Sequence, residues 1–319
     1  MFYRLIKIPA RFAIRLYCRN IAVNNKDIFL AKGPLLIASN HPNSFLDAII
    51  LATLFERPVY SLTRGDTFKK KSYALLLQSL NMLPVYRMSE GAENLEQNYE
   101  TFDKCREIFK QNGIVLIFSE GRCINEWKLR PLKKGTARLA MSSWQEGINL
   151  RIIPTGINYQ SFTSFGKNIQ VNFGNTISAK AICNTNGYGN TINDFNEILK
   201  LELKKLVVEA EPADKQTIQK IFEIKVHAVK KTLLFLPALA GYLLHAPLYI
   251  PIQKFCWRKA RQVDHYDSVL VGILFISYPF YLLLTALLIY SLTGGFWWIL
   301  TFFLLPFFAW SFVQLKGQF

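Results

Sequence analysis

The stretch LLIASNHPNSFLDAII (residues 35–50) contains the change of secondary structure that decides the fold. Its short apolar run ends at Ser39, as expected of a buried strand. Pro42 suits the first position of a helix, and an apolar segment of helical length follows it. The sequence therefore predicts a strand that ends at Ser39, a helix that begins at Pro42, and His41 at the junction between them.

The same alternation continues as far as Tyr159. Short apolar runs typical of buried strands are separated by segments with helical periodicity, such as residues 93–111. The further runs are VYSLT, LPVY, GIVLIF and LRIIPTGI, and NIQVNFG (168–174) can add another strand. This pattern predicts an α/β domain in which helices flank a sheet.

The charge of the chain indicates an acidic partner. Its 319 residues include 38 Lys and Arg but only 22 Asp and Glu, which gives a formal net charge of +16. Nucleic acid and anionic lipid both fit such a charge. Residues 268–315 contain no Asp, Glu, Lys or Arg, and such a stretch belongs in a bilayer. We therefore expect an acidic phospholipid membrane as partner, and no nucleic acid.

The cysteines predict neither a metal site nor a disulfide framework. Five are scattered along the chain without CxxC or Cys/His spacing. A reducing compartment is the expected surrounding of the domain that carries them.

Three regions are expected along the chain. Residues 1–30 carry basic residues at positions 4, 7, 11, 15 and 19 between apolar ones, which predicts an amphipathic helix at the membrane interface. An ordinary helix that packs one face on its own domain is the alternative. Residues 31–231 are expected to form the α/β domain, and residues 232–319 a membrane-embedded region.

The membrane-embedded region is expected to contain a helical hairpin. Residues 269–290 and 296–313 are each about long enough to cross a bilayer. The uncharged segment 232–253 contains Pro237, Pro247 and Pro251, which should break a straight spanning helix. A basic loop is then expected at residues 254–261.

The positive charges near these segments suggest a topology. Basic loops close to a span tend to stay cytoplasmic, and three full spans would export residues 254–261. We therefore hypothesise that the proline-containing segment enters and leaves the same leaflet. The α/β domain, the basic loop and Lys316 would then all lie on the cytoplasmic side.

His41 is the strongest candidate for a catalytic residue. At a helix start, exposed amides and the helix dipole disfavour the imidazolium, so the imidazole can accept a proton from an alcohol. Asp47 lies close enough in sequence to orient the ring. The alternative is a capping turn at His41, with Asp47 as a solvated helix residue.

Five motifs in order extend this interpretation. The run NHPNSFLD, followed by NMLPVYR, IVLIFSEG, LRPLKKGTA and IIPTGI, resembles the glycerolipid acyltransferase superfamily, which includes lysophosphatidate and glycerol-3-phosphate acyltransferases. The similarity covers Gly33 to Tyr159. It implies a mixed sheet flanked by helices and an O-acyltransferase of phospholipid synthesis. His41 would be the base and Asp47 its partner.

The resemblance also implies the substrates. The acyl donor would be acyl-CoA or acyl carrier protein, and the acceptor lysophosphatidate (1-acyl-sn-glycerol-3-phosphate) or glycerol-3-phosphate. No cofactor or metal is expected, because a thioester is already activated. Backbone amides near the helix start are expected to hold the oxyanion.

Further residues are expected to bind the acceptor. By resemblance Arg87 contacts its phosphate, and Glu120 and Gly121 lie at the acceptor site. The superfamily's usual Glu-Gly-Thr-Arg is Glu-Gly-Arg-Cys here, so Arg122, Arg130 or Lys133 is expected to supply the missing cation. The alternatives are a surface arginine at position 87 and a solvated basic face at 130–134.

Two departures leave the subtype open. Five residues separate His41 from Asp47, whereas the commonest superfamily pattern has four. The acceptor could instead be another lyso-lipid or an acylated amino-acid lipid. A non-catalytic protein that binds acidic lipids is the alternative from another class. The expected location is a membrane, the bacterial inner membrane, with the catalytic domain on the cytoplasmic side.

Overall fold

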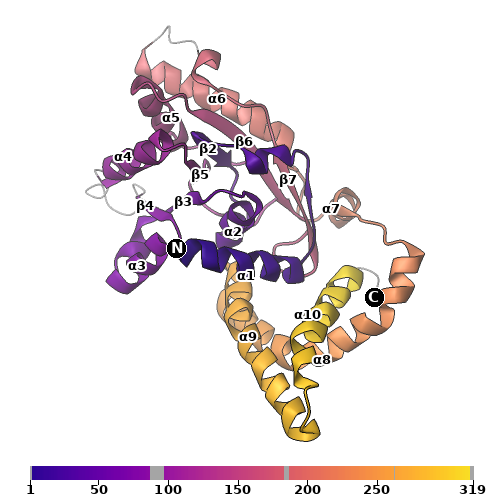
Figure 1. The fold of residues 1–319 in the computed structure, drawn as a ribbon. Helices are drawn as coiled ribbons and strands as arrows, with labels where there is room; N and C mark the ends of the chain where they lie inside the picture. Colours follow the sequence, from indigo (N-terminus) through magenta and orange to yellow (C-terminus); the bar gives the residue numbers. More distant parts are fainter. Residues whose placement is uncertain (1, 87–96, 183–186, 262, 317–319) are drawn as a thin grey trace.

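A computed structural model describes residues 2–86, 97–182, 187–261 and 263–316. A seven-stranded sheet with the order β1-β7-β6-β2-β5-β3-β4 forms its centre (Figure 1). The strands are β1 (Cys18–Val23), β2 (Leu35–Ser39), β3 (Val59–Arg64), β4 (Met82–Val85), β5 (Ile114–Phe118), β6 (Arg151–Tyr159) and β7 (Lys167–Phe173).

The sheet is mixed, as the superfamily resemblance predicts. Strands β6, β2, β5, β3 and β4 run parallel to one another. β7 pairs antiparallel with β6, and β1 pairs parallel with β7. The carboxyl ends of β6, β2 and β5 therefore meet at one edge of the sheet.

Helices cover both faces of the sheet. α1 (Phe2–Tyr17) and α2 (Phe45–Leu54) lie on one face, and α4 (Gln97–Lys110), α5 (Gly135–Gln145) and α6 (Tyr188–Leu206) on the other (Figure 1). Successive side chains of a strand point to opposite faces of the sheet. In β2, Ile37 therefore packs in the core on the side of α1 and α2, and Ala38 packs in the core on the side of α4, α5 and α6. The smaller helices are α3 (Lys71–Ser79), α7 (Lys215–Phe222) and the 3₁₀ segments Asp27–Leu30, Gly65–Phe68 and Ala179–Ala181.

The N-terminal helix is shorter than the range predicted for it, residues 1–30. α1 ends at Tyr17, and the next residues form β1, because their backbone pairs with β7. Ile14 and Tyr17 are buried in the core of the domain. Other apolar side chains of α1 are exposed: Phe2, Leu5, Ile8 and Phe12. The helix thus packs one end on the domain and presents an apolar row to its surroundings.

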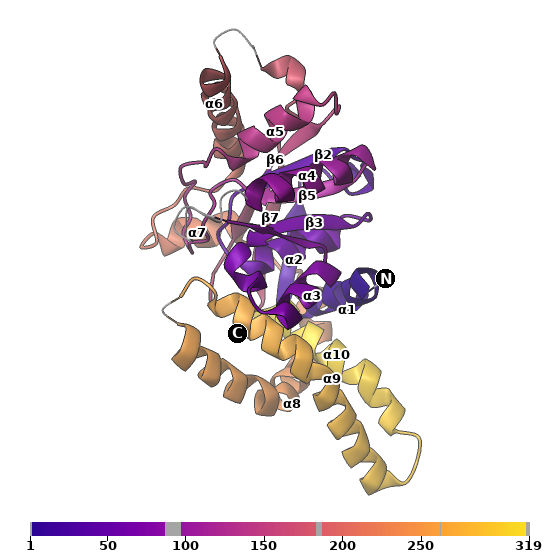
Figure 2. The same ribbon diagram turned by 90° about the vertical axis from the view of Figure 1, so that its left-hand side faces the viewer.

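Three C-terminal helices are long and apolar enough to cross a membrane: α8 (Ala228–Ala260), α9 (Tyr266–Thr293) and α10 (Trp298–Leu315). α9 and α10 form a hairpin that projects away from the sheet (Figure 2). Its turn begins at Gly294, which has the positive φ of 62° that ends many helices.

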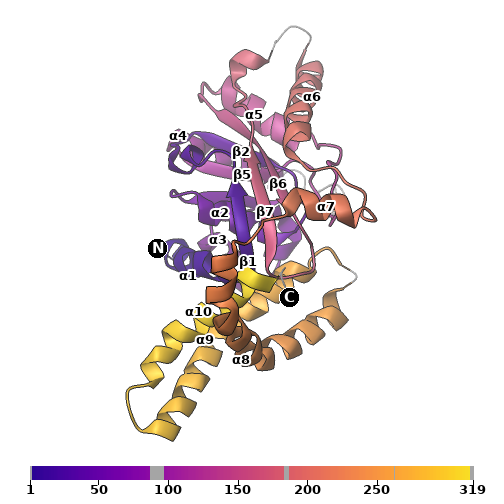
Figure 3. The ribbon, with the colours of Figure 1, turned by 90° about the vertical axis from the view of Figure 1, so that its right-hand side faces the viewer.

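The prediction that prolines break the first of these segments is wrong. Pro237, Pro247 and Pro251 all lie inside the continuous helix α8, and the basic residues 254–260 form its last turns instead of a loop. Each proline removes one backbone donor and bends the helix without ending it. Figure 3 shows the resulting curvature of α8.

The start of α8 is linked to the α/β domain through α10, and the end of α8 packs on the domain directly. Near its start, Lys230 Nζ donates to Gln314 Oε1 at 2.7 Å, and Gln314 Nε2 donates to the Arg19 carbonyl at 3.1 Å. Near its end, Cys256 and Ala260 are buried in the same core as the first turn of α2. α8 therefore leaves the domain and returns to it within 33 residues.

Candidate active site

The candidate site lies at the carboxyl ends of three neighbouring strands. His41 follows β2, Glu120 follows β5, and Tyr159 is the last residue of β6. Because these strands are parallel, the three residues come to the same edge of the sheet. Open α/β sheets bind their ligands at this edge.

His41 and Asp47 form a hydrogen-bonded pair. His41 Nδ1 lies 2.8 Å from Asp47 Oδ2, and the Asp47 side chain is fully buried. The same carboxylate accepts the backbone N–H of Asn43 at 2.8 Å and the hydroxyl of Tyr159 at 2.6 Å. Burial and the nearby Asp47 charge hold the pKa of Tyr159 well above its ordinary value, so its hydroxyl stays a donor.

The loop before α2 explains how the longer His-to-Asp spacing is accommodated. α2 begins at Phe45, so the predicted start at Pro42 is wrong. Ser44 has φ 54° and ψ −134°, a region that residues other than glycine rarely occupy. This turn brings Asp47, in the first turn of α2, back to His41. The amino-terminal end of the helix also favours the negative charge of Asp47.

Glu120 contacts the backbone of this loop. Its Oε2 accepts the His41 N–H and its Oε1 accepts the Arg130 N–H, each at 2.9 Å. The residue is 4% exposed, and burial raises the pKa of its carboxyl although both bonds oppose that shift. The ring of Phe118 stacks on the His41 imidazole at a centroid distance of 3.8 Å. Glu120 and Phe118 therefore fix the position of His41.

Backbone amides at the start of α2 do not form the expected oxyanion site. The amide of His41 donates to Glu120, and that of Asn43 to Asp47. The Ser44 amide donates to Cys123 Sγ at 2.9 Å, and the Leu46 amide to Ser268 Oγ at 3.1 Å. That expectation is wrong for these four donors, since each already has a partner within the protein.

The expected acceptor-binding cations differ in their surroundings. Arg122 and Lys133 are exposed, and Gly121 between Glu120 and Arg122 has φ 66°. Arg130 is partly buried and its Nε lies 3.6 Å from Glu126 Oε1, but its Nη1 is buried and has no hydrogen-bond partner among the described residues. Arg87 lies outside the described residues. Arg130 is thus the described cation whose guanidinium retains a buried donor for a ligand.

Several residues of the site were not foreseen from the sequence. Tyr159 is the last residue of β6, two positions beyond the IIPTGI motif. Asn40 pairs with Ile157 of β6 in both directions, at 3.0 and 2.8 Å, and so extends the strand pairing up to His41. The signal for both was their place at the carboxyl end of a predicted strand.

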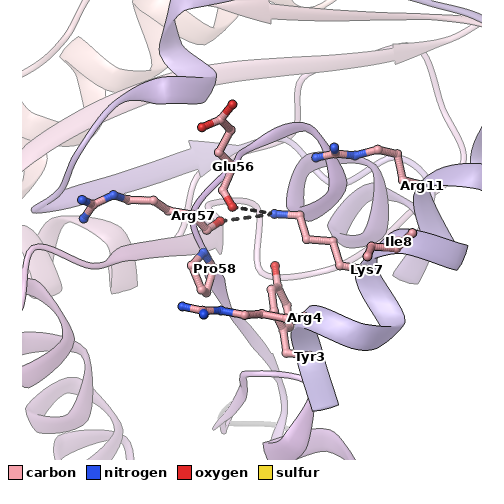
Figure 4. Close-up of a pocket in the computed structure, with 8 residues that line it drawn as sticks. All are labelled: Tyr3, Arg4, Lys7, Ile8, Arg11, Glu56, Arg57 and Pro58. Carbon is pink, nitrogen blue, oxygen red and sulfur yellow. Dashed lines mark hydrogen bonds between the residues drawn. The ribbon is translucent and has the colours of Figure 1, made fainter. Parts of the chain in front are cut away.

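An open hollow of about 590 Å³ lies elsewhere, between α1 and the turn that follows α2 (Figure 4). Lys7 donates to the carbonyls of Phe55, Glu56 and Arg57, and Arg11 to that of Thr53. These cations bind the carboxyl-terminal end of α2, where carbonyls lack helical partners. Burial and the neighbouring Arg11 lower the pKa of Lys7 to about 8. The hollow is therefore at the opposite end of α2 from His41.

Comparison with known proteins supplies the family. A family model described as Acyltransferase matches residues 20–158, which include His41, Asp47 and Glu120 and stop one residue before Tyr159. Residues 20–158 carry an acyltransferase domain. The resemblance to glycerolipid acyltransferases read from the motifs is confirmed, and acyl transfer is the activity of such a domain.

Two further comparisons complete the findings for the acyltransferase domain. No curated protein sequence matches the chain. Among solved structures, the chain matches a crystal structure described as the 1-acyl-sn-glycerophosphate (LPA) acyltransferase PlsC from Thermotoga maritima. The identity is 12% and the TM-score 0.42, over 64% of this chain and 79% of that one.

Proposed function

We propose that the chain transfers a fatty acyl group from acyl-CoA or acyl carrier protein to the hydroxyl of lysophosphatidate or glycerol-3-phosphate, with His41 as general base. The observation that carries this proposal is the 2.8 Å contact between His41 Nδ1 and Asp47 Oδ2 inside the acyltransferase domain. The site residues proposed are those predicted from the motifs, with Tyr159 added.

The geometry supports a direct transfer. With Nδ1–H donated to the Asp47 carboxylate, Nε2 of His41 is the nitrogen that accepts the hydroxyl proton. The acceptor oxygen attacks the thioester carbonyl carbon, and the tetrahedral intermediate collapses as the carbon–sulfur bond breaks. The leaving thiolate takes the proton from His41, which yields an ester and a free thiol. Asp47 stabilises the charge on the ring throughout.

A covalent acyl-enzyme on Cys123 is not part of this mechanism. Burial, followed by the charge of Asp47, raises the pKa of this thiol far above its ordinary value. Its sulfur accepts the Ser44 amide and thereby supports the turn that holds the His41–Asp47 pair. A buried neutral thiol is a poor nucleophile, so we assign Cys123 a structural part.

The acceptor's phosphate is proposed to bind the cations that follow β5. Arg130 shares Glu120 with the backbone of His41, so its main chain lies next to the base. A guanidinium donates in parallel to two phosphate oxygens, which suits the unpartnered Nη1. We propose Arg122, Lys133 and Arg87 as further contacts, with Gly121 allowing the chain to turn at this point.

The membrane region is proposed to hold the domain at an acidic bilayer. The α9–α10 hairpin would be embedded, and the end of α8 packs on the domain, as the single-leaflet arrangement requires. The net charge of +16 fits anionic lipid, and the exposed row on α1 fits the interface. We propose the bacterial inner membrane, with the acyltransferase domain on the cytoplasmic side.

Acyl transfer by purified protein in lipid vesicles tests the proposal. Radiolabelled acyl-CoA and acyl carrier protein are each offered with glycerol-3-phosphate or lysophosphatidate. His41→Ala should lower kcat by about 10²- to 10⁴-fold. His227→Ala, a change at an exposed histidine before α8, is the matched control and should retain activity.

Other outcomes have defined meanings. Transfer only to a different lyso-lipid or an acylated amino-acid lipid would keep the chemistry and replace the acceptor. Lipid binding without transfer to any acceptor, equal in wild type and His41→Ala, would favour a non-catalytic lipid-binding protein.

A further inference from the structure

We infer that Asp267, in the first turn of α9, is a positioning residue that holds the His41–Asp47 loop in its active geometry through Asn43. This inference rests on the proposed function for its kinetic test but not for its structural one. It assigns to a helix of the membrane region a direct part in the arrangement of the site.

Asp267 lies at the centre of a buried polar cluster. Its side chain is fully buried and forms an ion pair with Lys167 of β7, whose side chain is also fully buried. Its carboxylate also accepts the hydroxyl of Tyr17 at the end of α1 and Nδ2 of Asn43 at 2.7 Å. Three separate elements therefore meet on one carboxylate.

Asn43 connects this cluster to the proposed base. Its side chain binds Asp267, while its backbone N–H donates to the same Asp47 oxygen that contacts His41. Asn43 is fully buried, so its amide has no water with which to replace Asp267. Loss of the acceptor on α9 would leave the Asn43 amide unsatisfied and free the loop to move.

The start of α9 contacts the same loop at two more points. Ser268 Oγ accepts the Leu46 amide at 3.1 Å and donates to the Asn43 carbonyl at 3.2 Å. His265 Nδ1 lies 2.7 Å from Ser44 Oγ. The strained turn at Ser44 is thus enclosed between β2 and the first residues of α9.

Stability alone does not explain why Lys167 and Asp267, two charged residues, are buried here. A buried ion pair contributes little net stability compared with well-packed apolar residues, because both groups lose their water. The carboxylate of Asp267 instead fixes the orientation of its partners, because its two oxygens bind Tyr17, Lys167 and Asn43 at once. Positional precision of this kind matters most beside a reacting group.

Two double variants separate positioning from folding. Lys167→Met with Asp267→Asn removes both charges but keeps an amide oxygen for Asn43. Lys167→Met with Asp267→Leu removes both charges and that oxygen. Asn43→Ala leaves the ion pair intact and serves as a third variant, and Tyr17→Phe removes a bond to Asp267 that does not lead to the loop.

The structural readout is the proton NMR signal of the His41 Nδ1–H, identified by its loss in His41→Gln. The Asp267→Asn pair and Tyr17→Phe should keep this signal. The Asp267→Leu pair and Asn43→Ala should lose or broaden it. In acyl transfer at saturating substrates, the latter two should show kcat lowered by about 10- to 100-fold, and their combination no further loss.

Each alternative result has one meaning. If the Asp267→Leu pair or Asn43→Ala, folded by circular dichroism and thermal melting, keeps both the signal and kcat, the inference is wrong. If the Asp267→Asn pair loses activity as fully as the Asp267→Leu pair, charge and not orientation matters, which also overturns it. If the signal responds as expected but wild type transfers no acyl group, the positioning stands and the proposed function fails.

Discussion

His41 Nδ1 lies 2.8 Å from Asp47 Oδ2, and Ser44, the middle of the five residues between them, has a φ of 54°. Without that positive φ, the loop could not fold the added residue back toward α2. Backbone strain of this kind costs about 1–3 kcal/mol and persists where the surroundings enforce it. The turn at Ser44 is therefore the local condition for the pair.

A glycine at position 44 should be more stable than an alanine. Both changes remove the contact of the Ser44 hydroxyl with His265, so they differ in backbone freedom alone. At this φ, Ser44→Gly should exceed Ser44→Ala by about 1 kcal/mol in free energy of unfolding, measured in detergent with a chemical denaturant. Equal stability of the two variants would contradict a strained turn.

Tyr159→Phe should lower kcat without changing the KM of the acceptor. The hydroxyl binds Asp47 and orients it for His41, so its loss weakens the base and not substrate binding. A fall of about 10-fold is expected from one bond to a charged group. Asp47→Asn should be more severe, at about 10²-fold or beyond, and an equal effect of the two would assign Tyr159 a larger part.

Arg130→Gln should weaken binding of the phosphorylated acceptor. The backbone contact with Glu120 remains, whereas the unpartnered guanidinium nitrogen is lost. The acceptor KM should rise by about 10-fold with the donor KM unchanged. Arg138→Gln, at an exposed position on α5, is the matched control. A rise in the donor KM instead would place the donor's phosphates at Arg130.

Because Glu120 is buried, the free energy of unfolding should depend on pH in a specific way. Burial raises its pKa in the folded protein above the unfolded value, so the folded state binds the proton more readily. Relative to Glu120→Gln, the wild-type protein should gain stability as the pH falls from the raised value toward 4.5. The stability difference should be level above and below that interval.

Thermal melting of both proteins across this pH range measures the effect. A wild-type protein that loses stability relative to Glu120→Gln on acidification would show that the bonds from His41 and Arg130 outweigh burial. Glu120→Gln should also reduce activity, because an amide side chain cannot accept both backbone N–H groups.

The membrane arrangement is testable by cysteine labelling. In a background with Cys183→Ser, Arg258→Cys reports the end of α8 and Ser291→Cys reports the end of α9. If α8 stays within one leaflet, Arg258→Cys should react with an impermeant maleimide only in inverted vesicles, and Ser291→Cys only in spheroplasts. The reverse pattern would show that α8 spans the membrane.

The fold was largely predictable because its signals are local. The apolar runs predict β2 through β7, and the superfamily motifs predict that His41 and Glu120 belong to one site. β1 was missed because CRNIAV is not a continuous apolar run, and only pairing with β7 makes it a strand. α8 was misjudged because proline propensity is local, whereas the helix is held by packing on α10 and α9.

The site was predictable only where one motif carries it. His41 and Asp47 lie six positions apart, so a single stretch of sequence contains both. Tyr159 and Asp267 reach the same loop from positions 112 residues beyond Asp47 and 224 beyond Asn43. The local sequence around such residues does not indicate which distant side chain each will contact in the fold.

The contact of Asn43 with α9 also bears on how the protein is made. Asn43 precedes Asp267 by 224 residues, so a nascent chain completes its sheet long before this acceptor leaves the ribosome. Until then the buried amide of Asn43 has no partner on α9. The His41–Asp47 loop thus gains its partners on α9 only after the apolar hairpin has begun to emerge, so completion of the proposed site is coupled to synthesis of the helices that could enter a membrane.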